Sequence, residues 1–143
     1  SMGGDLALDT TRPDWATEVK GAGGADVVLD MVGATFFAAN VELLRPDGRL
    51  VVIATMSGHE VEVDLRLLMI KRLTLTASTL RARDADEKAR LAHAVETHVW
   101  PWLDTGRMRP IIDRTFPLER AGEAHQWLEQ GSQFGKVVLL TDV

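Results

Sequence analysis

Cysteine is absent from all 143 residues of the sequence. Its absence excludes disulfide bonds, thiolate nucleophiles and cysteine-ligated metals within this chain. Long hydrophobic runs are absent too, since stretches such as Val27–Leu29 and Leu50–Ala54 are far too short to cross a bilayer. The N-terminus has no basic stretch followed by an apolar one, so we expect no secretory signal and a cytoplasmic protein.

A concentration of positive charge is also absent. The formal net charge is −5, and lysine and arginine are scattered along the chain rather than clustered. Because phosphate backbones are bound by clustered basic residues, we expect no nucleic acid partner. The composition that remains, with 45% hydrophobic and 26% charged residues, is typical of a globular protein with a packed core.

Several motifs of catalysis and metal binding are missing. No GxSxG, phosphate-loop or Ser-His-Asp pattern occurs, so the sequence gives hydrolases and NTPases no support. The four histidines, His59, His93, His98 and His125, do not share a metal-binding spacing with carboxylates on one helical face. We interpret them as surface histidines and expect no metal site.

Two apolar segments predict parallel strands over Asp26–Met31 and Arg49–Thr55. Between them, Phe37, Val41 and Leu44 recur at helical spacing and predict a crossover helix. Both strands are continuously apolar, which is typical of a sheet covered by helices on both faces. The sequence therefore predicts an α/β fold with a doubly wound parallel sheet.

Other elements are predicted around this pair of strands. A helix begins near Pro13, and Asp64 is a plausible N-cap of a short helix. The alternating segment Leu73–Thr79 predicts a strand at a sheet edge, and such edges favour pairing with another chain. A longer helix is predicted over Asp84–Trp102, where Pro101 bends or ends it.

The character of the sequence changes near Thr105, where we place a domain boundary. The two predicted domains are therefore residues 1–105 and residues 106–143. The second begins with a strand, continues with a helix and closes with another strand, at Pro110–Ile112, Leu118–Gly131 and Lys136–Leu140. These later elements need not belong to the same sheet as the earlier ones.

Three predicted strand ends could approach a ligand. They are Val32–Ala34, Ala54–Gly58 and Ser78–Leu80, and they are rich in glycine and small side chains. Sheets of this class bind nucleotides at the carboxyl ends of their strands, and hydroxyl groups there suit an amide or a ribose. The alternative interpretation is that these segments are ordinary strand-to-helix turns.

Two charged residues near these ends are further candidates. Asp30 lies inside an apolar strand, where a charged carboxylate is costly. It could be a catalytic acid. The simpler interpretation is that it accepts local backbone N–H bonds at the end of the sheet. Arg81 directly follows a strand end and could reach a phosphate or a substrate. The alternative is that the mixed-sign run Arg81–Arg90 is a solvated helix start.

Four segments, taken in order, resemble a known family. They are GGADVVLDMVG, LLRPDGRLVVIATMSG, LRARD and FPLERAGEAHQWLEQGSQFGKVVLL. In order and spacing they resemble the C-terminal half of medium-chain dehydrogenase/reductases, in the quinone oxidoreductase branch of the zinc-binding dehydrogenase family. The resemblance covers nearly the whole chain, from Gly4 to Leu140.

The resemblance implies an enzyme that transfers hydride from NADPH to a quinone or an α,β-unsaturated carbonyl, generally without catalytic zinc. It names no catalytic residue in this half. It implies contacts with the nicotinamide end of the cofactor from three loops, and a contact near the adenine from a fourth position. The implied cofactor-binding residues are Val32, Gly33, Ala34, Ile53, Ala54, Thr55, Met56, Ser78, Thr79 and Leu80, with Thr10 near the adenine.

The resemblance also implies that parts of the family's protein lie before Ser1, among them the glycine-rich phosphate loop and the catalytic domain. The family's sheet order, three-two-one-four-five-six, leaves strands three to six in this chain as a partial Rossmann-type sheet. The closing strand, helix and strand would return to the catalytic domain. By itself the chain is then expected to be inactive and to bind NADPH weakly or not at all.

Two other functions remain open on the sequence. One is a zinc-dependent alcohol dehydrogenase, in which the residues that bind the zinc ion would lie mostly outside this chain. The other is a non-catalytic α/β interaction module that pairs through Leu73–Thr79. We expect a homodimer through that edge, or another form of self-association.

Overall fold

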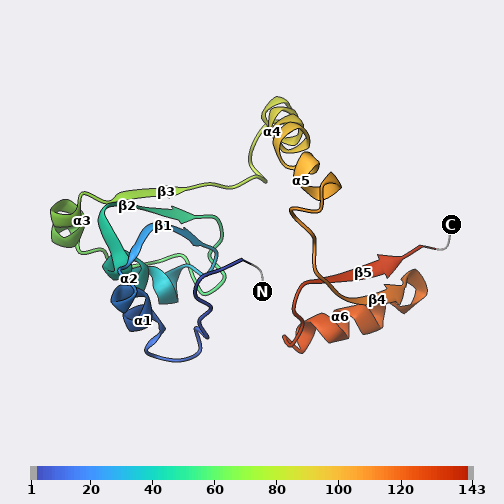
Figure 1. Ribbon diagram of the computed structural model, residues 1–143, viewed down its shortest axis with the longest axis horizontal. Coiled ribbons are helices and arrows are strands. Elements are labelled where there is room, and N and C mark those ends of the chain that lie inside the picture. Colours follow the sequence, from blue (N-terminus) through green and yellow to red (C-terminus); the bar gives the residue numbers. More distant parts are fainter. Residues whose placement is uncertain (1–2, 142–143) are drawn as a thin grey trace. The chain divides into compact units, whose positions relative to one another are not determined.

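The computed structural model describes residues 3–141. It divides the chain into two units, with the boundary along the sequence between Arg83 and Asp84. The first unit holds a three-stranded parallel sheet in the order β1-β2-β3, and the second holds a two-stranded parallel sheet of β4 and β5 (Figure 1). The predicted boundary near Thr105 falls inside the second unit. The assignment of residues 1–105 and 106–143 to two domains remains a prediction.

The first unit alternates helices and strands along the chain. Its elements are α1 (Trp15–Gly21), β1 (Ala25–Asp30), α2 (Ala34–Leu43), β2 (Leu44–Val52), α3 (Leu65–Lys71) and β3 (Thr74–Ala77). Each predicted strand and helix of this part is present, which confirms the α/β fold with a parallel sheet. Strand β3 lies at the edge of the sheet, as its alternating pattern predicted.

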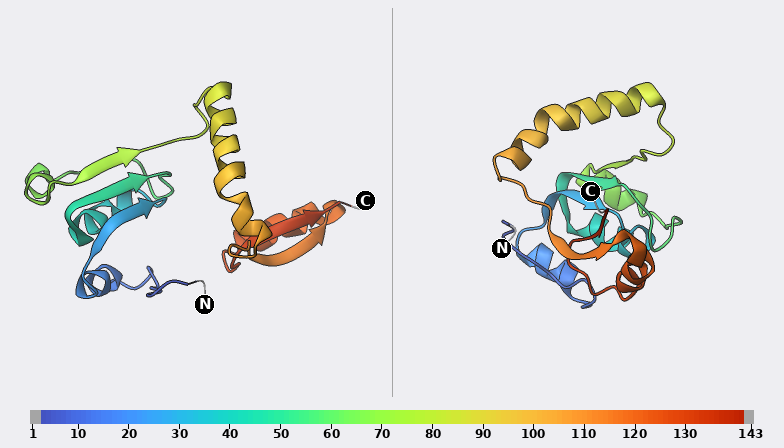
Figure 2. Two further views of the ribbon diagram at one scale, coloured as in Figure 1. Left: turned by 45° about the horizontal axis from the view of Figure 1, so that its top comes forward. Right: turned by 90° about the vertical axis from the view of Figure 1, so that its right-hand side faces the viewer.

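The core of the first unit lies on one face of its sheet. Leu44 and Leu50 are almost completely buried, together with Val41 of α2. Helices α1 and α2 lie on the same side of the sheet, and the ring centroids of Trp15 and Phe36 are 4.9 Å apart (Figures 1 and 2). Burial of these apolar groups provides the main stabilisation of this unit.

The opposite face of the sheet is exposed. The side chains on this face alternate along the chain with those on the buried face. They are Val27 and Leu29 of β1 and Met31 just after it, and they are 52–65% exposed. The continuous apolar pattern of β1 predicted helices on both faces. Among the described residues, helices cover one face of the sheet. A doubly wound sheet has a helical layer on each face, and one of these two layers is present here.

The number of strands and several of their bounds differ from the prediction. The first unit's described sheet has three strands, whereas the resemblance implied four, the family's strands three to six. In the order three-two-one-four-five-six, strand three pairs with strand two, and residues 3–141 contain no strand that pairs in this way. Strand β2 begins at Leu44 rather than Arg49, because a register shift accommodates the turn at Asp47, where φ is 65°.

The second unit contains two helices followed by a small sheet and its covering helix. Its elements are α4 (Ala85–His98), α5 (Trp100–Asp104), β4 (Ile112–Pro117), the 3-10 turn η1 (Leu118–Arg120), α6 (Ala121–Glu129) and β5 (Lys136–Leu140). The predicted long helix is divided at Val99, directly before the turn that contains Pro101. The predicted strand, helix and strand at the end of the chain are present.

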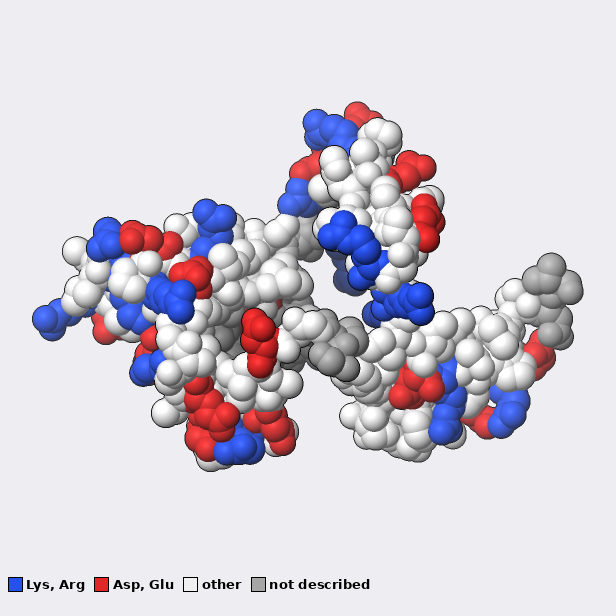
Figure 3. Space-filling model, in the orientation of Figure 1, with Lys and Arg blue, Asp and Glu red and all other residues white. Residues whose placement is uncertain are grey.

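The charged side chains follow no single-sign pattern on the surface that Figure 3 shows. Lysine and arginine lie interspersed with aspartate and glutamate on each unit. Among the described residues, no helix is long and apolar enough to cross a membrane.

Candidate functional site

The candidate site is built from the loops at the carboxyl ends of β1, β2 and β3. Parallel strands bring their carboxyl ends to the same edge of a sheet, so segments far apart in the sequence meet there. At this edge the backbone N–H of Ile53 donates to the carbonyl oxygen of Asp30 at 2.8 Å. The N–H of Ser78 donates to the carbonyl oxygen of Val52 at 3.0 Å.

Asp30 holds the turn after β1. Its side chain is 4% exposed, and Oδ1 accepts the N–H of Val32 at 2.8 Å. The N–H of Gly33 lies 3.3 Å from Oδ1 and 3.2 Å from Oδ2. The carboxylate therefore compensates its burial with local backbone hydrogen bonds, which confirms the simpler of the two interpretations of this residue.

Ser57 joins the loop after β2 to the loop after β1. Its hydroxyl donates to the carbonyl oxygen of Val32 at 2.8 Å and accepts the N–H of Thr35 at 3.1 Å. The backbone N–H of Ser57 donates to the same carbonyl oxygen of Val32 at 2.8 Å. These bonds fix the relative position of the two loops.

Gly33 allows the two loops to approach closely. A Cβ atom at this position would lie 2.6 Å from the carbonyl oxygen of Gly58 and 2.9 Å from Cα of Thr55. The neighbouring N–H of Ala34 donates to the same oxygen of Gly58 at 3.1 Å. The contact between the loops thus depends on the absence of a side chain at Gly33.

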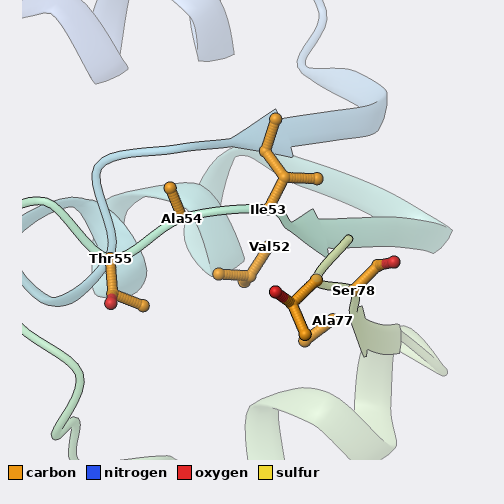
Figure 4. Close-up of a pocket in the computed structure, with 7 residues that line it drawn as sticks. Val52, Ile53, Ala54, Thr55, Ala77 and Ser78 are labelled. Atoms are coloured by element: carbon orange, nitrogen blue, oxygen red, sulfur yellow. The ribbon is translucent and has the colours of Figure 1, made fainter. Parts of the chain in front are cut away.

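Two adjacent cavities open at this edge of the sheet. The first has a volume of about 390 Å³ and is formed where the loop after β2 meets the end of β3 (Figure 4). Its lining residues are Val52, Ile53, Ala54, Thr55, Ala77, Ser78 and Thr79. The second has a volume of about 240 Å³ and is lined by Asp30, Gly33, Ala34, Phe37, Val52, Thr55, Gly58, His59, Val61 and Ala77.

The structure brings together most of the residues that the resemblance implied for cofactor binding. Those at the two cavities are Gly33, Ala34, Ile53, Ala54, Thr55, Ser78 and Thr79. Val32 contributes its carbonyl oxygen to Ser57, while Met56 and Leu80 are 81% and 60% exposed beside the cavities. Thr10 lies in the turn between Asp9 and Arg12 and lines neither cavity.

Two residues near the site were not predicted. His59 is exposed, as expected of a surface histidine, and it also lines the second cavity. Arg83, from the mixed-sign run, donates from Nε to the carbonyl oxygen of Thr79 at 3.0 Å. Sequence spacing could not find these contacts, because they depend on how each loop turns back after its strand.

Charged groups contribute little to the lining of the first cavity. Its polar groups are the hydroxyls of Thr55, Ser78 and Thr79 together with backbone amides and carbonyls. Such a lining suits a neutral, hydrogen-bonding group better than an ion. Within residues 3–141, no three His, Cys, Asp or Glu side chains lie together as potential metal ligands.

A parallel sheet with crossover helices, and with a cavity at the carboxyl ends of its strands, defines this chain as a Rossmann-type α/β protein. The family model described as "Zinc-binding dehydrogenase" matches residues 2–139. The chain belongs to this family, as the resemblance of its sequence motifs indicated.

Comparisons with individual proteins agree with this family membership. The quinone oxidoreductase of Lama guanicoe is 31% identical over 121 residues, which cover 84% of this chain and 35% of that protein. A crystal structure of an NAD-dependent alcohol dehydrogenase superposes with a TM-score of 0.75 at 31% identity, covering 98% of this chain and 39% of that one. A mycobacterial protein in complex with NADPH gives a TM-score of 0.72 at 30% identity, covering 96% and 43%.

These relatives confirm that the chain belongs to an oxidoreductase family whose members include NADPH-binding proteins. The chain spans about 35% of the length of the curated relatives that it matches. The reaction, the substrate and the assembly of the whole protein are therefore matters for proposal.

Proposed function

We propose that this chain forms the nicotinamide-facing part of the cofactor site in an NADPH-dependent oxidoreductase. The complete enzyme transfers hydride to a quinone or an α,β-unsaturated carbonyl. The observation that carries this proposal is the first cavity, where the loop after β2 and the end of β3 present hydroxyls and backbone groups at the carboxyl edge of the sheet. The NADPH-bound mycobacterial neighbour supports the choice of cofactor.

The residues of the cavity fit a carboxamide. A carboxamide has one carbonyl acceptor and two N–H donors, and it carries no charge. The hydroxyls of Thr55 and Ser78 can donate to its oxygen or accept its N–H groups, while Ile53 and Ala54 supply apolar contact. When bound, NADPH supplies the hydride. The chain's residues bind and orient the nicotinamide end and exclude water from it.

The test follows the oxidation of NADPH by absorbance in the complete enzyme, with quinones and with α,β-unsaturated carbonyls as acceptors. Thr55→Val and Ser78→Ala are each expected to raise KM for NADPH by roughly tenfold, since a lost hydrogen bond in a binding site costs about 1 kcal/mol or more. Ser132→Ala, an exposed serine of the second unit, is the matched control. Wild-type enzyme without NADPH-dependent turnover would contradict the proposal.

A zinc-dependent alcohol dehydrogenase is the second candidate. It is favoured by the structural similarity to an NAD-dependent alcohol dehydrogenase. In that case the complete enzyme reduces NAD with an alcohol as donor, and a chelator abolishes its activity. The same spectrophotometric assay, run in both directions and with a chelator, distinguishes the two reactions. A protein inactive in both directions would favour the non-catalytic interaction module.

We also propose that the protein forms a homodimer through the edge of β3. All four residues of Thr74–Ala77 are exposed, and a free strand edge offers unpaired backbone groups to a second copy. Thr76→Lys is expected to give monomers in sedimentation velocity, because a lysine on an exposed edge opposes strand pairing. Thr97→Lys, on the exposed surface of α4, is the control and is expected to leave the dimer intact. A monomeric wild type would refute this assembly.

A further inference from the structure

Arg83 contacts the rim of the first cavity from outside its lining. A turn closes behind β3, since the N–H of Arg83 donates to the carbonyl oxygen of Leu80 at 3.2 Å. The side chain of Arg83, a half-buried residue, then reaches back to the end of the strand. Nε donates to the carbonyl oxygen of Thr79 at 3.0 Å, and Nη2 donates to Oγ of Ser78 at 2.7 Å. One side chain thus holds two consecutive residues of the rim.

The direction of these bonds determines what the rim can offer a ligand. A guanidinium has five N–H donors and no acceptor, so Oγ of Ser78 must accept this bond. The hydroxyl hydrogen of Ser78 is then directed elsewhere and can donate to a ligand. The carbonyl oxygen of Thr79 has two lone pairs and keeps one for a ligand's N–H group. The rim therefore presents a donor and an acceptor on neighbouring residues.

We propose that Arg83 is a positioning residue for the nicotinamide carboxamide. Through Ser78 and Thr79 it fixes a donor and an acceptor that match the carbonyl and the N–H groups of that amide. The inference rests on the proposed function and assigns to Arg83 a role that acts through the rim, without contact with the reacting atoms. In this role the guanidinium acts on the ligand through the groups of Ser78 and Thr79 to which it donates.

Lysine cannot replace arginine in this role. The planar guanidinium donates in two fixed directions, whereas the ammonium group of lysine is a single point at the end of a flexible stem. Arg83→Lys keeps the charge and loses the two-point hold. It therefore separates a positioning role from a purely electrostatic one.

The experiment compares two cofactors in the complete enzyme: NADPH, and its reduced analogue in which an acetyl group replaces the carboxamide. The acetyl group keeps the carbonyl and has no N–H donors. Arg83→Gln and Arg83→Lys are expected to raise KM for NADPH about tenfold with kcat nearly unchanged, and KM for the analogue by about threefold or less. Arg90→Gln removes the same charge from the exposed surface of α4 and is expected to leave both KM values unchanged.

The outcomes separate this inference from the proposed function. Equal increases of KM for both cofactors, or no increase, would overturn the positioning role while the NADPH reaction of the wild type stands. A wild type without NADPH-dependent turnover overturns both. The thermal unfolding midpoint of each variant is measured in parallel, and KM increases that simply follow a lowered midpoint for both cofactors count against the positioning role.

Discussion

Gly33 has a φ of 89° and lies where the loops after β1 and β2 touch. An alanine there must adopt a left-handed backbone, and its Cβ would lie 2.6 Å from the carbonyl oxygen of Gly58. Two independent reasons therefore require glycine at this residue. The sequence contains 12 glycines, and it does not reveal which of them carries this double constraint.

Gly33→Ala is expected to lower the free energy of unfolding by about 1–3 kcal/mol, because the strained backbone and the close contact both act in the folded state. The control is Gly21→Ala at the end of α1, where a Cβ meets nothing within 4 Å. Its effect is expected to be neutral or stabilising, since alanine favours the helix. Urea unfolding of both variants measures the difference. Equal effects of the two substitutions would refute the argument.

Asp113 is a second residue whose surroundings can be tested. Its Oδ2 accepts the indole N–H of Trp127 at 2.8 Å, and its Oδ1 accepts the N–H of Phe134 at 3.2 Å. The bond from Trp127, followed by that from Phe134, lowers the pKa of Asp113 below its usual value. The guanidinium of Arg114 stacks 3.7 Å from the ring centroid of Trp127, so the carboxylate, the indole and the guanidinium form one cluster.

This cluster predicts a pH dependence of stability. The pKa of Asp113 is lower in the folded chain than in the unfolded chain, where it is about 3.9, so its contribution is present above that value. The contribution is lost as the pH falls through the folded pKa. Asp113→Asn is expected to flatten the decline of the unfolding midpoint below about pH 4. Asp104→Asn, at the end of α5, is the control, and equal flattening in both would contradict the prediction.

At the scale of elements, α3 caps α2. The last carbonyl groups of a helix have no partner within it, and α2 ends without a glycine cap. Nζ of Lys71, at the end of α3, donates to the carbonyl oxygens of Val41 at 3.2 Å, Glu42 at 2.6 Å and Leu44 at 2.8 Å. One ammonium group thereby uses its three donors and joins two helices to the beginning of β2.

Lys71→Met is expected to lower the free energy of unfolding by about 1–3 kcal/mol, because it leaves these carbonyl oxygens without their charged donor. Lys20→Met is the matched control, since Lys20 forms an exposed ion pair with Glu42 at 3.3 Å. Exposed pairs contribute about 0–1 kcal/mol. Chemical denaturation compares the two variants, and a Lys71 effect as small as that of Lys20 would contradict the capping role.

Element types were more predictable than element ends. Asp64 and Asp84 accept backbone N–H bonds in the first turns of α3 and α4, as local capping rules indicate. The division before Pro101 also follows from a local cause. The early start of β2 does not, because Leu44 joins the ladder through its pairing with Ala25, which is a tertiary contact.

At the scale of the whole molecule, the cofactor requires more than the first unit contains. The 143 residues include no glycine-rich phosphate loop, and the first cavity is lined by strand-end residues of β2 and β3 rather than by such a loop. The pyrophosphate of a dinucleotide is usually bound by such a loop at a helix N-terminus. Without contacts to the pyrophosphate, we expect the nicotinamide end alone to bind weakly.

The 143-residue polypeptide by itself is therefore expected to bind NADPH weakly or not at all. A fluorescence titration of reduced cofactor against the polypeptide measures this directly. The Ser78→Ala variant is the control, because any weak binding at the first cavity should decrease further in it. Nanomolar binding by the wild-type polypeptide would show that another part of the chain holds the phosphates.

The sequence by itself determined the class of the fold and the three loops of the candidate site. Apolar strands, helical spacing and small residues at strand ends are local patterns, and the carboxyl ends of parallel strands necessarily share one edge of the sheet. The tertiary structure alone decided which side chains meet at that edge. Asp30 holds its own turn, Gly33 admits the neighbouring loop, and Arg83 returns to Ser78, because each contact depends on the path of the backbone after a strand has ended.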